Sequence, residues 1–205
     1  MRKSRAHICG PQRSCKRTAT IVGLVLAFLF GSAPGVSAAE ESALWYALAS
    51  EGHAALLRHA IAPGTGDPLE FAIGDCSTQR NLSEEGRQQA RQIGALFRKN
   101  GIEAARIFSS QWCRCLETAR LLGLGPVTEL PILNSFFQRP ERRNRQIQKL
   151  EEWLASQGLD GPLVLVTHQV NITALTGVYP ASGELVVIRQ SKNEEISAVG
   201  SIRTD

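Results

Sequence analysis

Two histidines of the sequence each follow a short apolar run. The run 54–57 is followed by Arg58 and His59, and the run 163–166 leads through one threonine to His168. Each run has the length and composition of a buried strand. Ligands of an open parallel sheet bind at the carboxyl ends of its strands. If these two strands are neighbours, His59 and His168 should approach each other at one edge of the sheet.

A second guanidinium is expected at the same edge. A third strand over 106–108 is followed by a helix over 111–122, which carries Arg114 in its first turn. Helical side chains lean toward the N-terminus of their helix, so Arg114 should point back to the histidines. The helix start also offers unpaired amide groups that favour an anion. Each residue alone more often has a structural role, but together they predict a phosphate site, because a guanidinium binds phosphate oxygens in pairs.

The elements that must position these residues alternate between strands and helices. Apolar runs predict strands over 54–57, 106–108, 127–130, 163–166 and 184–189, and periodicity with caps and stops predicts helices over 41–50, 83–99, 111–122, 140–157 and 170–175. A long loop over 61–80 is rich in glycine and proline, and the tail after residue 190 carries little signal. This alternation predicts an α/β fold, a three-layer α/β/α sandwich with a mostly parallel central sheet.

The first 38 residues have the pattern of a secretory signal peptide. A basic stretch precedes the apolar run 19–31, and small residues follow, so cleavage is expected after Ala38, with Ala39 as the alternative. The thirteen residues of the run are too few for a membrane anchor, which needs about 20. We therefore expect residues 39–205 to form a single exported domain, periplasmic or secreted.

The charge distribution supports this division of the chain. The formal net charge is +4, but residues 1–38 hold six basic and no acidic residues. Of the 23 basic residues, 23 − 6 = 17 therefore remain in residues 39–205 against 19 acidic ones, which is a net charge of −2. The basic character belongs to the leader, so it does not indicate a nucleic-acid or membrane partner. A hydrophobic content of 43% with 20% charged residues is that of an ordinary globular protein.

Export changes how the cysteines are interpreted, since Cys76, Cys113 and Cys115 would remain in the mature chain. An oxidising compartment favours one disulfide and one free thiol. Cys113 and Cys115 are too close in sequence to form an easy bridge, so Cys76 should pair with one of them. A zinc site is less favoured because the usual two-pair ligand spacing is missing. We expect no metal.

Four blocks of the sequence resemble, in order, the motifs of the histidine phosphatase (phosphoglycerate mutase-like) superfamily. Residues 57–60 are similar to its Arg-His-Gly signature with alanine for glycine, and the other blocks lie at 82–90, 109–119 and 166–168. The resemblance implies that His59 is a nucleophile that forms a phosphohistidine, which water then hydrolyses. It also implies that Arg58, Arg114 and His168 bind the phosphoryl oxygens, with no cofactor.

The source of the leaving-group proton departs from the family pattern. Members close to the mutases have a glutamate where this sequence has Ser135, and the other large branch has an aspartate where it has Gln169. Asp67, in the loop after the nucleophile, is the first candidate for the general acid, followed by Glu129 and then Glu70. For Asp67, a solvated loop carboxylate is the competing interpretation.

These residues predict an exported phosphomonoesterase, a histidine acid-type phosphatase, acting on a small or envelope-associated phosphate ester. A catalytically weak phosphate-ester-binding protein of the same fold and a phosphomutase are the alternatives. A thiol-redox role for Cys113 and Cys115 is a third possibility, since Arg114 between them offers an electropositive setting. The sequence makes no prediction about the oligomeric state or about which phosphate ester is bound.

Overall fold

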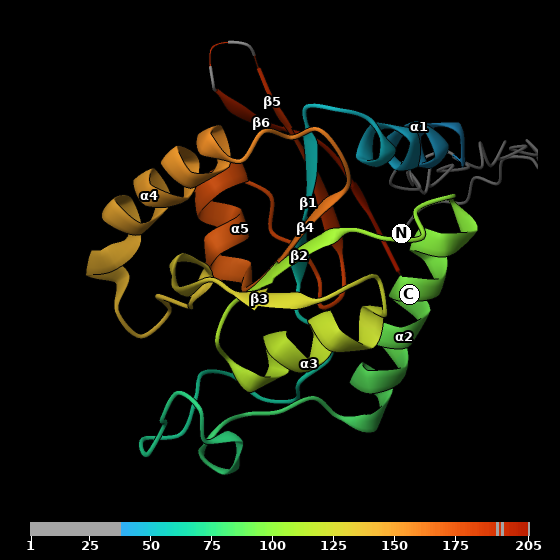
Figure 1. The fold of residues 1–205 in the computed structure, drawn as a ribbon. Coiled ribbons are helices and arrows are strands. Elements are labelled where there is room, and N and C mark those ends of the chain that lie inside the picture. The colour runs from blue at the N-terminus through green and yellow to red at the C-terminus, as the bar shows by residue number, and fades with distance from the viewer. Residues whose placement is uncertain (1–37, 192, 194, 205) are drawn as a thin grey trace, which may run out of the picture. The chain divides into compact units, whose positions relative to one another are not determined.

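The computed structural model describes residues 38–191, 193 and 195–204 (Figure 1). The signal peptide is predicted over residues 1–38, of which residues 1–37 lie outside the described residues, and the cleavage expected after Ala38 or Ala39 would fall at the first residues of the first helix. The helices are α1 (Ala38–Ala49), α2 (Glu84–Lys99), α3 (Cys113–Leu122), α4 (Arg143–Ser156) and α5 (Gln169–Thr176). The strands are β1 (His53–Arg58), β2 (Arg106–Ser109), β3 (Val127–Glu129), β4 (Leu163–Thr167), β5 (Leu185–Gln190) and β6 (Ile196–Ile202). Short 3₁₀ turns occur at Cys76–Thr78, Pro131–Leu133 and Pro140–Arg142.

The strands form one sheet in the order β3-β2-β4-β1-β5-β6. The neighbours β3, β2, β4 and β1 run parallel, whereas β5 and β6 are antiparallel to the strands beside them. In the register between β1 and β4, Arg58 pairs with Thr167. The next residue of each strand is a histidine, so the sheet delivers His59 and His168 to the same level of its carboxyl edge.

Alternate side chains of the strands enter two separate cores. One core joins Ala55, Leu57, Val164 and Val166 to apolar residues of α1, α2 and α3. The other joins Ala54, Leu56, Leu163 and Leu165 to apolar residues of α4 and α5. The helices therefore cover both faces of the sheet (Figure 1), and the predicted three-layer α/β/α fold is confirmed. None of the helices in the described part of the chain has the length and apolar character that crossing a membrane requires.

The structure differs from the prediction mainly at the C-terminal end. Strand β6 lies in the tail that showed little signal, because it is an edge strand on which only Ile202 is buried. Such a strand lacks the clear apolar alternation of a half-buried one, and its pairing with β5 supplies the order that its side chains do not. The predicted helix over 140–157 is divided into a 3₁₀ turn and α4.

Two glycines let helix α2 approach other backbone segments closely. A Cβ at Gly94 would lie 2.0 Å from the Leu122 carbonyl oxygen at the end of α3, and a Cβ at Gly86 would lie 2.0 Å from that of Ile61. Any side chain at either place would push the segments apart. The close contact at Gly86 matters for the site, because Ile61 lies two residues after His59.

Candidate active site

His59 stands at the end of β1 with one ring nitrogen occupied and the other directed at an arginine. Its Nδ1 lies 2.8 Å from the carbonyl oxygen of Ala60, so Nδ1 carries the hydrogen and donates it. Its Nε2 then accepts a hydrogen bond from Nε of Arg114 at 3.2 Å. Burial, and next the charge of Arg114, lower the pKa of His59 to about 3. The ring is therefore neutral at physiological pH, with the Nε2 lone pair facing the guanidinium.

The segment after His59 is held by two neighbouring helices. The backbone N–H of Ala60 donates to the hydroxyl of Thr118 in α3 at 3.1 Å, and that hydroxyl donates to the Arg114 carbonyl at 2.7 Å. The N–H of Ile61 donates to Oε1 of Gln89 in α2 at 3.1 Å. Because Ala60 accepts the Nδ1 hydrogen of His59, these bonds orient the His59 ring through the peptide that holds it.

His168 lies beside His59, as the register of the two strands requires. The centroids of the two imidazole rings are 5.5 Å apart. The Nε2 atom of His168 is 2.9 Å from the hydroxyl of Ser110 and 3.5 Å from Sγ of Cys115. Burial lowers the pKa of His168 well below its ordinary value, with Arg114 and His59 adding to the effect. The second ring is thus also neutral and has a single N–H to donate.

Three guanidiniums surround the two rings. Arg114 is buried, at 2% exposure, whereas Arg58 and Arg80 are each about half-buried. Arg58 donates through Nη1 to the Pro180 carbonyl at 2.9 Å, and its buried Nε has no partner among the described residues. Arg80 donates to the carbonyl oxygens of Gly66 and Ala62. Burial lowers the pKa of both Arg58 and Arg80, and Arg114 contributes to both shifts.

Arg80 is the site residue that the sequence analysis missed. It closes the glycine-rich loop 61–80, immediately before the block 82–90 that resembles the family motif. That position is the only signal in the sequence that could have found it, since the loop returns there to the strand end that carries His59. The structure places Arg80 among the residues that line the pocket with His59 and Arg114.

Asp67 forms a bidentate ion pair with Arg114. Its carboxylate oxygens accept from Nη1 at 2.5 Å and from Nη2 at 3.1 Å, and the indole N–H of Trp112 donates to it at 2.9 Å. Burial by itself raises the pKa of Asp67, but the hydrogen bonds from Arg114 and Trp112 outweigh it and hold the pKa below its usual range. In this arrangement Asp67 is an anion that occupies the guanidinium fork of Arg114.

The other two acid candidates lie elsewhere. Glu129 is exposed at the end of β3, where it accepts a hydrogen bond from the side chain of Gln111 at 3.2 Å. Glu70 is exposed on the loop. Neither is among the residues that line the pocket, of which Asp67 is the one carboxylate. Ser135, the serine for which the family resemblance implied a glutamate, does line the pocket.

The pocket between these groups is small and positively charged. Its volume is about 160 Å³, and its walls carry three guanidiniums, two neutral imidazoles and one carboxylate. The excess positive charge stands out because residues 39–205 have a net charge of −2. Such a pocket favours a tetrahedral oxyanion. No group of three or more histidine, cysteine or acidic side chains that could hold a metal ion is found among the described residues.

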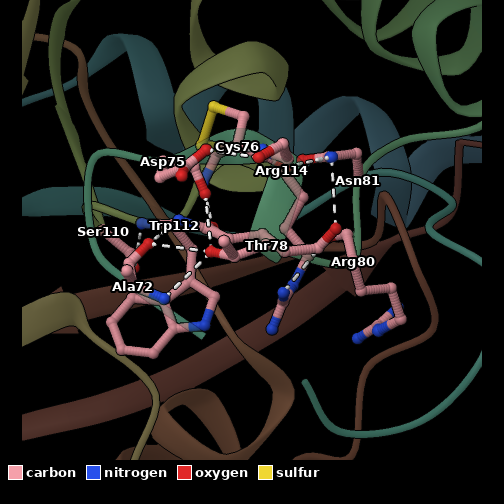
Figure 2. The surroundings of a disulfide bond; sticks show 12 residues. Ala72, Asp75, Cys76, Thr78, Arg80, Asn81, Ser110, Trp112 and Arg114 are labelled. Atoms are coloured by element: carbon pink, nitrogen blue, oxygen red, sulfur yellow. Dashed lines mark hydrogen bonds between the residues drawn. A yellow bond between two sulfur atoms is a disulfide. The ribbon is translucent and has the colours of Figure 1, made fainter. Parts of the chain in front are cut away.

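A disulfide links the loop 61–80 to the start of α3. It joins Cys76 to Cys113 with a Cα–Cα distance of 5.7 Å, which leaves Cys115 free and buried. Figure 2 shows Arg80 and Arg114 extending in the same direction away from this disulfide. Burial raises the pKa of the Cys115 thiol to about 12, so it is not the low-pKa thiolate that a redox role requires.

Comparison with known proteins agrees with the sequence motifs. Residues 55–136 match the sequence model of the histidine phosphatase superfamily (branch 1). The resemblance predicted from the sequence is thereby confirmed, and a phosphatase is supported at the level of this superfamily. No curated protein matches the sequence.

Several solved structures share the fold. The protein histidine phosphatase SixA complexed with tungstate is 13% identical, with a TM-score of 0.54 over 74% of this chain and 97% of that one. A putative α-ribazole-5'-P phosphatase from Escherichia coli is 16% identical, with a TM-score of 0.55 over 76% and 98%. A phosphoserine phosphatase mutant from Entamoeba histolytica, in complex with phosphoserine, is 14% identical, with a TM-score of 0.54 over 75% and 98%. At these identities the likeness establishes the fold.

Proposed function

We propose that this protein hydrolyses phosphomonoesters through a phosphohistidine on His59. The observation that carries the proposal is the neutral, buried ring of His59, whose Nε2 lone pair faces Arg114 at 3.2 Å. A nucleophilic histidine must be neutral to attack, and a cation beside the attacking nitrogen stabilises the charge of the arriving phosphoryl group. The positively charged pocket around His59 supports the same proposal.

The reaction divides into two displacements. Nε2 of His59 forms a bond to phosphorus while the ester P–O bond breaks, and the leaving oxygen takes a proton. Water then attacks phosphorus, the N–P bond breaks, and Nε2 recovers its electron pair as inorganic phosphate forms. The hydrogen bond from Nδ1 to the Ala60 carbonyl stabilises the positive charge on the phosphorylated ring. Arg58, Arg114 and His168 bind the equatorial oxygens, where the charge of the loose transition state lies.

Asp67 is the proposed source of the leaving-group proton. It is ionised while it pairs with Arg114. An arriving phosphate dianion competes for the same guanidinium and adds negative charge nearby, and both effects raise the pKa of the carboxyl. Asp67 then takes a proton from solvent and passes it to the ester oxygen. Replacing a general acid typically costs about 10²–10⁴-fold, most of all with poor leaving groups.

The nucleophile is tested with para-nitrophenyl phosphate and the substitution His59→Ala. We expect turnover by the wild type, none by the variant, and an acid-labile, base-stable phosphoenzyme trapped from the wild type only. Saturable phosphate binding without turnover would instead favour a phosphate-ester-binding protein. Transfer of the phosphoryl group to an added alcohol in place of water would favour a mutase.

The role of Asp67 as general acid is tested by assaying the Asp67→Asn variant on one substrate with a good leaving group and one with a poor leaving group. We expect kcat/KM for alkyl phosphates to fall about 10²–10⁴-fold, with a much smaller loss for para-nitrophenyl phosphate. Glu70→Gln, on the same loop but outside the pocket, is the matched control. An equal loss on both substrates would show that Asp67 only positions Arg114.

We also propose that the protein is exported after cleavage near Ala38. The Cys76–Cys113 disulfide supports this, because such bonds persist in oxidising compartments. The mass and N-terminal sequence of the protein recovered outside the cytoplasm test the proposal. A full-length chain retained in the cytoplasm with reduced cysteines would contradict it.

A further inference from the structure

A second cavity, which we call the side groove, adjoins the phosphate pocket. Its volume is about 550 Å³, more than three times that of the pocket. The two cavities share Asp67, Ser135 and Phe137 in their walls. The rest of an ester whose phosphoryl group lies beside His59 extends out of the small pocket, and the side groove, which borders the pocket at these shared residues, offers the space to receive it.

The side groove is lined by apolar side chains that are unusually open to solvent. Leu69 is 99% exposed, Phe137 55% and Ile73 51%. Behind them, the rings of Phe71 and Trp112 stack with centroids 4.7 Å apart. Of the seven large apolar side chains exposed in the described part of the chain, four line one of these two cavities. Clustered exposure of this kind marks a binding surface.

Unpaired positive charge lies at the rim of the side groove. Arg139 and Arg142 line it, and Arg143 and Arg145 follow at the start of α4. All four side chains are exposed, and none forms an ion pair within residues 38–191, 193 and 195–204. Glu141 is the one acidic residue between positions 139 and 145. This end of the groove therefore favours an anion.

We propose that the substrate is an amphiphilic phosphomonoester with a second anionic group. Its scissile phosphate would lie in the pocket with His59, its apolar part along Leu69, Ile73 and Phe137, and its second anion, a carboxylate or phosphate, near Arg139 and Arg142. This inference rests on the proposed function and adds the substrate class. The walls shared with the phosphate pocket favour a leaving group over a lipid surface as the occupant, since a groove that borders the pocket can receive what is bonded to the phosphate.

The apolar part is tested with n-alkyl phosphates from methyl to octyl, kept below their micellar concentrations. We expect kcat/KM to rise by up to about fourfold per methylene until the groove is filled, because each buried methylene contributes about that factor. The double substitution Leu69→Ser with Ile73→Ser should flatten this slope. Both side chains are exposed, so the variant should fold. Tyr46→Ser, at an exposed aromatic residue of α1 outside both cavities, is the matched control and should keep the wild-type slope.

The anionic part is tested by comparing an alkyl phosphate with a phosphate of equal length that ends in a carboxylate. We expect the carboxylate to raise kcat/KM by about two- to fivefold at low salt, which is the range of exposed ion pairs, and less at high salt. The double substitution Arg139→Ala with Arg142→Ala should abolish this preference. Arg120→Ala, an exposed arginine of α3 outside both cavities, should retain it.

The outcomes separate this inference from the proposed function. If kcat/KM is the same for every chain length, the proposal of an amphiphilic substrate is wrong, whereas the proposal of a phosphatase still stands. If no ester is turned over, the phosphatase proposal fails, and calorimetric binding of the same alkyl series measures the slope independently. A flat slope together with binding to anionic phosphatidylglycerol vesicles, lost in the Leu69 and Ile73 variant, would assign the surface to membrane docking and overturn the inference.

Discussion

Acidification should destabilise the protein by forcing a proton onto His59. The pKa of this ring is about 3 in the folded chain and about 6.5 in an unfolded one. Because the folded state disfavours the charged ring, its stability is full above pH 6.5 and declines as the pH falls toward 3. At about 1.36 kcal/mol per pH unit, the whole range corresponds to about 5 kcal/mol, of which about 2 kcal/mol is lost between pH 6.5 and 4.5, since the unfolded ring is only half protonated at pH 6.5.

Denaturant unfolding at pH 7.5, 6.5, 5.5 and 4.5 measures this loss, and His59→Gln isolates it. The variant has no titrating group at this position, so we expect its free energy of unfolding to fall by about 2 kcal/mol less than that of the wild type between pH 6.5 and 4.5. His168 and Asp67 remain in both proteins, so their contributions cancel to first order. His53→Gln, at a histidine that lies outside the pocket at the opposite end of β1, is the control. Parallel curves for wild type and His59→Gln would refute the burial of a neutral imidazole at position 59.

Two further predictions concern the pairing of Arg114 and the tether of the loop. Arg114→Lys should lower kcat/KM for para-nitrophenyl phosphate at least tenfold, because an ammonium cannot replace the two-pronged contact; activity equal to that of the wild type would remove Arg114 from the pocket. Replacing Cys76 and Cys113 together by serine should reduce the free energy of unfolding by about 4 kcal/mol, as estimated from chain entropy for a sequence separation of 37. It should also raise KM, because the loop with Asp67 loses its anchor. Cys115→Ser is the control, and an unchanged KM in the double variant would show that the loop is held without the disulfide.

The local sequence pattern was sufficient to predict most of the helices and strands. It also predicted four of the site residues, which are Arg58, His59, Arg114 and His168. Apolar runs with an abrupt polar end identify β1 and β4, and the helix that follows β2 carries Arg114 in its first turn. The hydroxyl of Ser83, the first residue of the helix predicted over 83–99, caps α2 by accepting a hydrogen bond from the Gly86 N–H. These features depend on neighbours within a few residues, so they can be predicted from a single sequence. Strand β6 could not be predicted in this way, since its order comes from pairing with β5.

The local sequence pattern could not predict which of Cys113 and Cys115 pairs with Cys76. Cys113 and Cys115 are two residues apart on one helix and therefore point about 200° apart around its axis. Only one of them can face the loop that carries Cys76, and the rotation of α3 against the sheet decides which. The structure turns Cys113 to the loop and buries Cys115 beside His168.

The sequence alone determined that two imidazoles and two guanidiniums stand at the ends of strands and at the start of a helix, because residue type and short-range pattern are enough for that. Tertiary structure alone decided that Arg80 joins them, that Asp67 fills the fork of Arg114, and that apolar side chains of the loop face Phe137 across a groove. The physical reason is that loop 61–80 has no repeating backbone geometry. Its path follows from distant contacts, which are the Cys76–Cys113 bond and the hydrogen bonds of Arg80 to Gly66 and Ala62.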